Sequence, residues 1–206
     1  MVLEQIRVGS DNFCYVIYCP VHKKAAIVDP GFDATKALQV LTSQNVQLEY
    51  VILTHYHSDH SSETKHLKKN YPLAQIVASK EDGKRLPIRP DVVVSDGSKL
   101  KVGTIVLSFL LTPGHTSGGI CIIVDGNALL TGDTLFIGDC GRTDLPGGSL
   151  EEMFQTLQEK ILSLPDDLIV YPGHDYGAKP FDSLGNQKRT NKTLRARTLK
   201  EFSLIP

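Results

Sequence analysis

The chain has 206 residues, enough for a sizeable core, and we expect residues 1–206 to form a single domain. Its net charge of -1 and pI of about 6.6 give no basic face for a nucleic-acid partner, and no apolar run approaches the roughly 20 residues of a membrane span. The N-terminus lacks a signal-peptide region and the four cysteines form no disulfide framework, so we expect a reduced, cytoplasmic protein.

The first half of the chain predicts strands interrupted by helices. Short apolar runs bounded by turn residues predict strands at 2–8, 12–18, 25–28, 50–53 and 75–78. Apolar residues at helical spacing predict a helix over 33–44, and a second helix is expected to follow Ser62. Residues 79–90 are polar, contain two prolines and predict a loop.

The second half repeats this order of strands and helices. Strands are predicted at 92–94, 99–102, 105–111, 120–124, 128–131 and 168–171. Ser149 and Glu152 form a capping-box pattern that begins a helix running to about Leu162, and a C-terminal helix is predicted over 187–202. This order suits two sheets packed face to face with helices outside.

The segment after strand 50–53 contains three of the seven histidines and an aspartate: His55, His57, Asp59 and His60. Imidazole together with carboxylate suits zinc, iron or manganese rather than calcium. A spacing of two lets His55 and His57 hold one ion, while Asp59 and His60 can point to a second ion beside it. The sequence therefore predicts a metal-binding loop at the end of this strand.

Three further blocks place ligand-type residues after apolar runs. They are T-P-G-H ending at His115, L-T-G-D ending at Asp133 and Y-P-G-H ending at His174. With the H-x-H-x-D-H pattern of 55–60, these blocks resemble the signature of the metallo-β-lactamase superfamily. The resemblance extends over nearly the whole chain and is closest to the glyoxalase II-like and persulfide dioxygenase-like branch.

The resemblance implies a fold and a set of metal ligands. The fold is an α/β structure, a four-layer αββα sandwich with the ligands on loops at one edge. The ligands form two sets of three: His55, His57 and His115 for one ion, and Asp59, His60 and His174 for the other. Asp133 has two oxygens and can bridge both ions. Asp29 matches a position that supports the site in this family, with an ordinary turn aspartate as the alternative.

The implied chemistry is hydrolysis by two divalent metals, zinc in the first place and iron or manganese as alternatives. Two such ions, roughly 3.5–4 Å apart, share a hydroxide and polarise a carbonyl oxygen, with Asp59 and Asp133 as the catalytic carboxylates. The chain contains no G-x-S-x-G motif to supply a side-chain nucleophile. We therefore expect a glyoxalase II-like metallo-hydrolase, similar to hydroxyacylglutathione hydrolases, that cleaves a small thioester or ester.

Two residues beside the ligands are candidates for substrate binding. Arg142 can hold a carboxylate with two hydrogen bonds, and Tyr176 can donate its hydroxyl next to the metals. The expected substrate is a small, thiol-derived molecule. For Arg142 the alternative is a structural ion pair with Asp139 or Asp144. The sequence leaves the acyl group, the carrier thiol and the oligomeric state open, and a homo-oligomer is compatible with it.

A persulfide dioxygenase is the alternative enzyme. Members of that subfamily hold one Fe(II) on the residues that match His55, His115 and Asp133, and they oxidise glutathione persulfide to sulfite. The chain matches their C-G-R-T-D and H-D-Y segments at 140–144 and 174–176. Tyr56 stands where glyoxalase II usually has His and the dioxygenases have a small residue or Cys, so the chain lies between the two groups.

Overall fold

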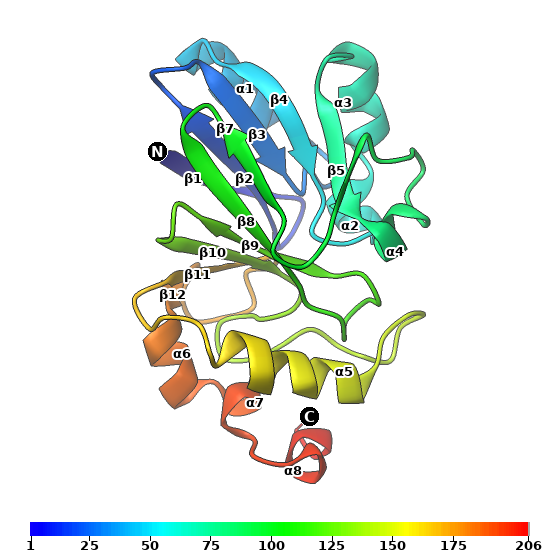
Figure 1. Cartoon of the computed structure of the whole chain (residues 1–206), viewed down its shortest axis with the longest axis vertical. Coiled ribbons are helices and arrows are strands. Elements are labelled where there is room, and N and C mark those ends of the chain that lie inside the picture. Colours follow the sequence, from blue (N-terminus) through cyan, green and yellow to red (C-terminus); the bar gives the residue numbers. More distant parts are fainter. Residues whose placement is uncertain (206) are drawn as a thin grey trace.

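Two six-stranded sheets pack face to face with helices on their outer sides (Figure 1). The structure is a computed structural model that describes residues 1–205. The strand order is β1-β2-β3-β4-β5-β6 in the first sheet and β12-β11-β10-β9-β8-β7 in the second. This arrangement confirms the predicted αββα sandwich.

The first sheet is built from the first half of the chain. Its strands are β1 (Val2–Val8), β2 (Asn12–Cys19), β3 (Lys24–Val28), β4 (Gln47–Ile52), β5 (Gln75–Ser79) and β6 (Val92–Val94). Its helices are α1 (Thr35–Gln44), α2 (Ser58–Ser61), α3 (Thr64–Asn70) and α4 (Lys80–Gly83). The prediction of a loop over 79–90 was wrong at α4, because the Ser79 side chain accepts a hydrogen bond from Asp82 N and begins a helical turn.

The second half forms the second sheet. Its strands are β7 (Lys99–Val102), β8 (Ile105–Leu111), β9 (Ile120–Val124), β10 (Ala128–Gly132), β11 (Ile169–Pro172) and the short β12 (Asp182–Ser183). Ser149 caps α5 (Leu150–Gln155) as predicted, and the helix continues as a π-helix over Thr156–Ile161. The single helix predicted over 187–202 was wrong: the chain forms α6 (Leu184–Thr190), α7 (Lys192–Arg195) and α8 (Leu199–Ser203).

Strand β2 shows how the apolar layers arise. All eight of its residues are buried, and its side chains alternate between the two faces of the sheet. Tyr15 and Ile17 enter the core between the sheets, where they join Phe109 of β8. Val16 faces the helix side and packs in the cluster that includes Leu41 of α1. Because both faces of β2 are buried, the residues that follow Asn12 form a continuous run of apolar and aromatic side chains and cysteines.

The ends of the parallel strands define the edge at which the candidate site lies. Strands β3, β4 and β5 run parallel, as do β10 and β11, so their carboxyl ends lie at common edges. Asp29 follows β3, the 55–60 segment follows β4, Asp133 follows β10 and His174 follows β11. The fold therefore brings these segments together from both sheets.

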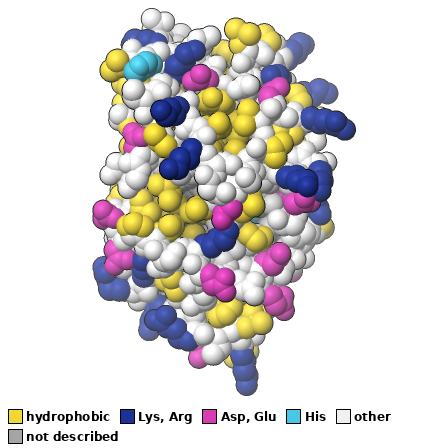
Figure 2. Space-filling model, viewed as in Figure 1, with side chains coloured by type: hydrophobic (Ala, Val, Ile, Leu, Met, Phe, Trp, Pro, Cys, Tyr) yellow, Lys and Arg dark blue, Asp and Glu magenta, His cyan; other side chains and the backbone are white. Residues whose placement is uncertain are grey.

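The outer surface carries mixed charge on the face shown in Figure 2. Lys and Arg side chains are interspersed with Asp and Glu there, with apolar patches between them. Within residues 1–205, no helix has the length and apolar character needed to cross a membrane. The expected absence of a nucleic-acid partner stays a prediction.

Candidate metal centre

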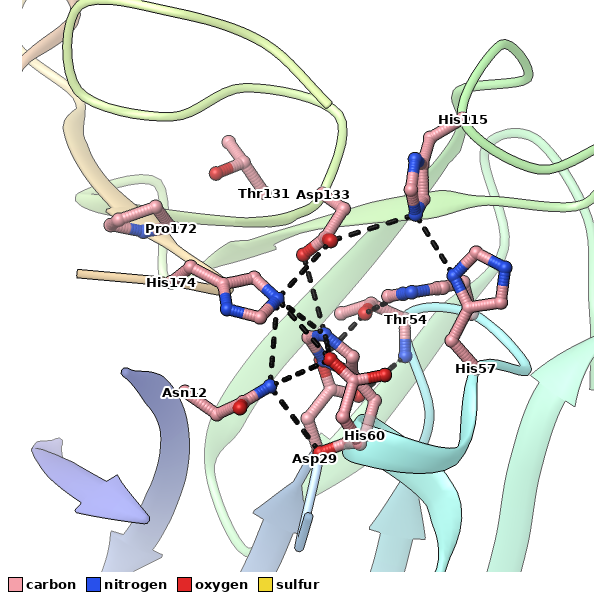
Figure 3. A network of polar contacts seen from close by, with 12 residues as sticks. Asn12, Asp29, Thr54, His57, His60, His115, Thr131, Asp133, Pro172 and His174 are labelled. Atoms are coloured by element: carbon pink, nitrogen blue, oxygen red, sulfur yellow. Dashed lines mark hydrogen bonds and ion pairs between the residues drawn. The ribbon is translucent and has the colours of Figure 1, made fainter. Parts of the chain in front are cut away.

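Three histidines converge at the edge of the sandwich and form the three-histidine group, His55, His57 and His115. Figure 3 shows His57 and His115 pointing toward each other. His55 and His57 lie in the turn that joins β4 to α2, and His115 lies in the loop between β8 and β9. The Nε2 atom of His115 is 2.9 Å from Nδ1 of His57. Because His115 Nδ1 donates to the Arg142 carbonyl at 2.7 Å, a neutral His115 turns the lone pair of Nε2 toward His57.

A second group, the Asp59 group, consists of Asp59, His60 and His174. His60 Nε2 lies 3.2 Å from His174 Nε2, and Asp59 Oδ2 lies 3.4 Å and 3.3 Å from these two nitrogens. Asn12, at the start of β2, donates from Nδ2 to Asp59 Oδ2 at 2.9 Å and fixes the carboxylate. Three ligand atoms are therefore held around a common point.

Asp133 lies between the two groups. Its Oδ1 is 3.3 Å from His60 Nε2, and its Oδ2 is 3.3 Å from His174 Nε2 and 3.5 Å from His115 Nε2. A Cβ on Gly173 would come within 2.3 Å of Asp133 Oδ1, so the neighbouring backbone leaves room for the carboxylate only because this residue is glycine. The geometry suits a carboxylate that serves both groups.

Asp29 supports the centre from below. Its Oδ1 accepts from Thr54 N at 2.8 Å, and its Oδ2 accepts from the Thr54 hydroxyl at 2.5 Å and from His60 Nδ1 at 3.0 Å. The Thr54 hydroxyl thereby accepts from His55 Nδ1 at 3.1 Å. Each imidazole therefore uses Nδ1 as a donor and turns its Nε2 toward the centre, where that nitrogen would bind a metal once it carries no proton.

The buried side chains of the centre differ in protonation state. Burial opposes the charge of His60 and His174, but Asp133 and the neighbouring carboxylates outweigh it, raising the pKa of His60 well above its usual value and that of His174 to about 9, so a bound cation would replace the protons on these two imidazoles. His55 and Asp133 already have the ionisation that a metal needs. Burial, reinforced by His60, lowers the pKa of His55 well below its usual value, so this imidazole is neutral. Burial opposes ionisation of Asp133, but the nearby charge of His60 and a hydrogen bond from His174 outweigh it and lower the pKa of the carboxyl. The buried Nε2 of His55 has no hydrogen-bond partner. A cation bound among these side chains would give His55 Nε2 a partner and would also accept the lone pairs of the histidine nitrogens that face one another.

The structure places the two expected substrate-binding residues at the rim. Tyr176 is 58% exposed, and its ring stacks on His174 with centroids 4.7 Å apart. Arg142 is exposed and forms two hydrogen bonds to Asp144, at 2.6 and 2.7 Å, so the ion-pair alternative is present. Both line a hollow of about 560 Å³ together with Phe136 and Lys192.

Sequence reasoning missed several polar contacts of the centre. Asn12 is one, since an asparagine that begins a strand carries no ligand signal. Asp82 is another: it lies in the segment predicted as a loop and hydrogen-bonds both histidine-bearing loops. His66, expected at the surface, is indeed exposed on α3 and lies outside both groups.

The fold and the two ligand groups define a class of α/β proteins that bind metals at the edge of a double sheet. The chain belongs to the metallo-beta-lactamase superfamily, whose family model matches residues 8–174. The crystal structure of ETHE1 from Myxococcus xanthus is similar with a TM-score of 0.90 at 29% identity, over 100% of this chain and 92% of that one.

Curated relatives include hydrolases and a dioxygenase. A probable polyketide biosynthesis zinc-dependent hydrolase of Bacillus velezensis is 34% identical over 87% of this chain and 80% of its own. A hydroxyacylglutathione hydrolase of Prochlorococcus marinus is 29% identical over 97% and 92%. The human mitochondrial persulfide dioxygenase ETHE1 is 29% identical over 90% and 72%. The chain is thus similar to enzymes of both kinds.

Proposed function

We propose that this protein is a metal-dependent hydrolase of the glyoxalase II-like type, which cleaves a small thioester or ester. The observation that carries the proposal is the completeness of the Asp59 group. A centre with a single metal on His55, His115 and Asp133 does not need Asp59, His60 and His174. These three nevertheless lie within 3.4 Å of one another, and His60 and His174 each lie 3.3 Å from Asp133.

The residues of the centre have distinct tasks in this proposal. When bound, two divalent metals, zinc in the first place and iron or manganese as alternatives, would supply a hydroxide and polarise the carbonyl oxygen. Asp133 serves both groups, and Asn12 holds Asp59 in place. Burial, with the charge of Asp139, raises the pKa of the nearby Cys140 thiol to about 12, so this thiol is no competing nucleophile.

Substrate binding is proposed for the hollow beside the centre. Arg142 and Tyr176 line it, and Lys192 adds a second cation near its wall. An anionic, thiol-derived substrate would pair with Arg142, with its acyl group directed toward the two ligand groups. The exposed ring of Tyr176, stacked on the ligand His174, would cover one side of the reacting group.

The test is Asp59→Ala, compared with wild type for metal content and thioester hydrolysis. If the proposal holds, the variant loses about one metal per chain together with hydrolysis, because the second ion has lost its carboxylate. His66→Ala is the matched control and should change neither quantity. Wild-type protein that binds two metals but hydrolyses no thioester or ester would refute the proposed reaction.

A mononuclear iron persulfide dioxygenase is the second candidate. It is favoured by the similarity to persulfide dioxygenase ETHE1 and by the His55, His115 and Asp133 set, a two-histidine, one-carboxylate arrangement. In that case Asp59→Ala would keep one iron and much of the persulfide-dependent O₂ uptake. Measuring O₂ uptake with glutathione persulfide on the same samples separates the two enzymes.

A further inference from the structure

We propose that Asp82 is a positioning residue that sets the geometry of the three-histidine group by holding both loops that carry it. The inference rests on metal binding at the proposed centre and not on the reaction catalysed there. Asp82 lies on α4, outside both ligand groups, and is only 1% exposed.

One oxygen of this carboxylate joins the two loops. Asp82 Oδ2 accepts from the backbone N–H of Tyr56 at 3.1 Å and from the hydroxyl of Thr116 at 2.7 Å. Tyr56 lies between His55 and His57 in the chain, and Thr116 directly follows His115. A single atom thereby fixes the immediate neighbours of all three histidines in the group.

The carboxylate has little freedom to move. The Ser79 hydroxyl accepts from Asp82 N at 3.3 Å and anchors the helical turn. On the other side, a Cβ on Gly118 would come within 2.6 Å of Asp82 Oδ1 and 2.5 Å of Ser79 Oγ, so the backbone of the His115 loop packs directly on this turn. Such close packing transmits the position of α4 to the loop.

Packing alone does not explain a carboxylate at this place. A buried charge is costly unless it is hydrogen-bonded, and Asp82 Oδ1 has no hydrogen-bond partner of good geometry. An apolar side chain would avoid that cost but would leave the fully buried Thr116 hydroxyl without its acceptor. What the carboxylate contributes is the connection between two loops that belong to different sheets.

Asp29, in contrast, serves both groups. Its Oδ2 accepts from His60 Nδ1 of the Asp59 group and from the Thr54 hydroxyl, which in turn accepts from His55 Nδ1. Asp82 instead accepts from Tyr56 and Thr116, farther along both histidine loops. Loss of Asp82 should therefore weaken one metal site and not the other.

The experiment measures zinc affinity at each site separately by competition with a chromophoric chelator. Asp59→Ala serves as the background that isolates the three-histidine group, and His57→Ala as the background that isolates the Asp59 group. Adding Asp82→Ala should lower zinc affinity about 10–100-fold in the first background and leave it within about 3-fold in the second. Asp82→Asn keeps an acceptor oxygen and should restore most of the affinity.

The matched control is Asp91→Ala. Asp91 also accepts from a backbone N–H, that of Ile76, and from a side chain, Lys68, but it lies away from both histidine loops. It should leave zinc affinity unchanged in both backgrounds. If Asp82→Ala does not fold, Thr116→Val and Thr116→Ser give the same test, with only Thr116→Val weakening the three-histidine group.

Three results would overturn the inference. They are unchanged affinity of the three-histidine group in Asp82→Ala, an equal loss in both backgrounds, and unchanged affinity of this group in Thr116→Val. Wild-type protein that binds two zinc ions without hydrolysing thioesters would refute the proposed reaction but leave this inference standing. Wild-type protein that binds no metal would refute both.

Discussion

At the scale of single residues, the Arg142 side chain is exposed to solvent and already forms an ion pair with Asp144. Its two hydrogen bonds to Asp144 join side chains that are 63% and 67% exposed. Exposed pairs of this kind contribute about 0–1 kcal/mol, so Arg142 can leave Asp144 for an anionic substrate at small cost. The ion pair and the proposed binding role are therefore compatible.

Arg142→Ala is expected to lower kcat/KM for an anionic thioester with metal content unchanged. Loss of one charge-assisted contact costs about 2–3 kcal/mol, or roughly 30–150-fold. Steady-state kinetics and metal analysis on the same sample measure both quantities. Arg197→Ala, an exposed arginine near α8, is the control. Equal kinetics for the two variants across several anionic thioesters would exclude Arg142 from binding.

The candidate ligands could be proposed from the sequence because each lies in a short local pattern directly after an apolar strand. Asp82 could not be found in this way, since its two hydrogen-bond donors lie 26 and 34 positions away in the chain. Asn12 contacts Asp59 across 47 positions and gives no local signal either. Residues that support a site through tertiary contacts become visible only once the strands are paired.

At the scale of elements, hydrogen bonds join the segment 139–148 to the loop that carries His55 and His57. Tyr56 donates its hydroxyl to the Pro146 carbonyl at 2.7 Å, and Arg85 donates to the same carbonyl and to the Tyr56 hydroxyl, each at 3.0 Å. The same segment supplies the Arg142 carbonyl that accepts from His115. Tyr56 thus connects the loop of His55 and His57 to the segment that carries Arg142, at the rim of the hollow proposed for substrate binding.

Tyr56→Phe is expected to loosen this segment without unfolding the protein. Two hydrogen bonds of the hydroxyl are lost, the one to the Pro146 carbonyl and the one from Arg85. Only the first joins Tyr56 directly to the segment; a neutral bond of this kind is worth about 0.5–1.5 kcal/mol, so backbone amides of 143–148 should exchange roughly 2–12 times faster. Hydrogen exchange read by mass spectrometry measures this, with Tyr71→Phe beside α3 as the control. Exchange in 143–148 that matches the control would show that Arg85 alone holds the segment.

The C-terminal elements show where sequence patterns stop being sufficient. The basic, helical pattern predicted one helix, but Asn191 interrupts it. Its buried Nδ2 donates to the carbonyls of Phe136 and Asp139, and its Oδ1 accepts from Thr193 N, so it ends α6 and caps α7. The hydrogen bonds of the Asn191 side chain to a distant loop thus outweigh the local preference for a continuous helix. The sheets, in contrast, follow apolar runs and turns that are local in the sequence.

At the scale of the whole molecule, each ligand group draws on both sheets. Loops of the first sheet carry His55, His57, Asp59 and His60, and loops of the second carry His115, Asp133 and His174. Bound metals would therefore link the two sheets and favour the folded state over the unfolded one. Stability and metal occupancy should change together.

Removing metal should lower the melting temperature. At a free metal concentration 100 times Kd, binding adds about 2.7 kcal/mol for one site, which corresponds to roughly 5–11 °C for a chain of this size. Differential scanning calorimetry before and after dialysis against a chelator, followed by zinc addition, measures the loss and its recovery. A melting temperature that does not respond to chelator would contradict a metal link between the sheets.

The order of strands in the two sheets has a consequence for dissecting the molecule. Every strand of the first sheet precedes residue 95 and every strand of the second follows residue 98, so the chain crosses between them at the turn that holds Gly97. A Cβ on Gly97 would meet no atom within 4 Å. Cutting the chain at this turn would divide each ligand group between two fragments, and metal-dependent reassembly of the fragments would become a direct reporter of the intact centre.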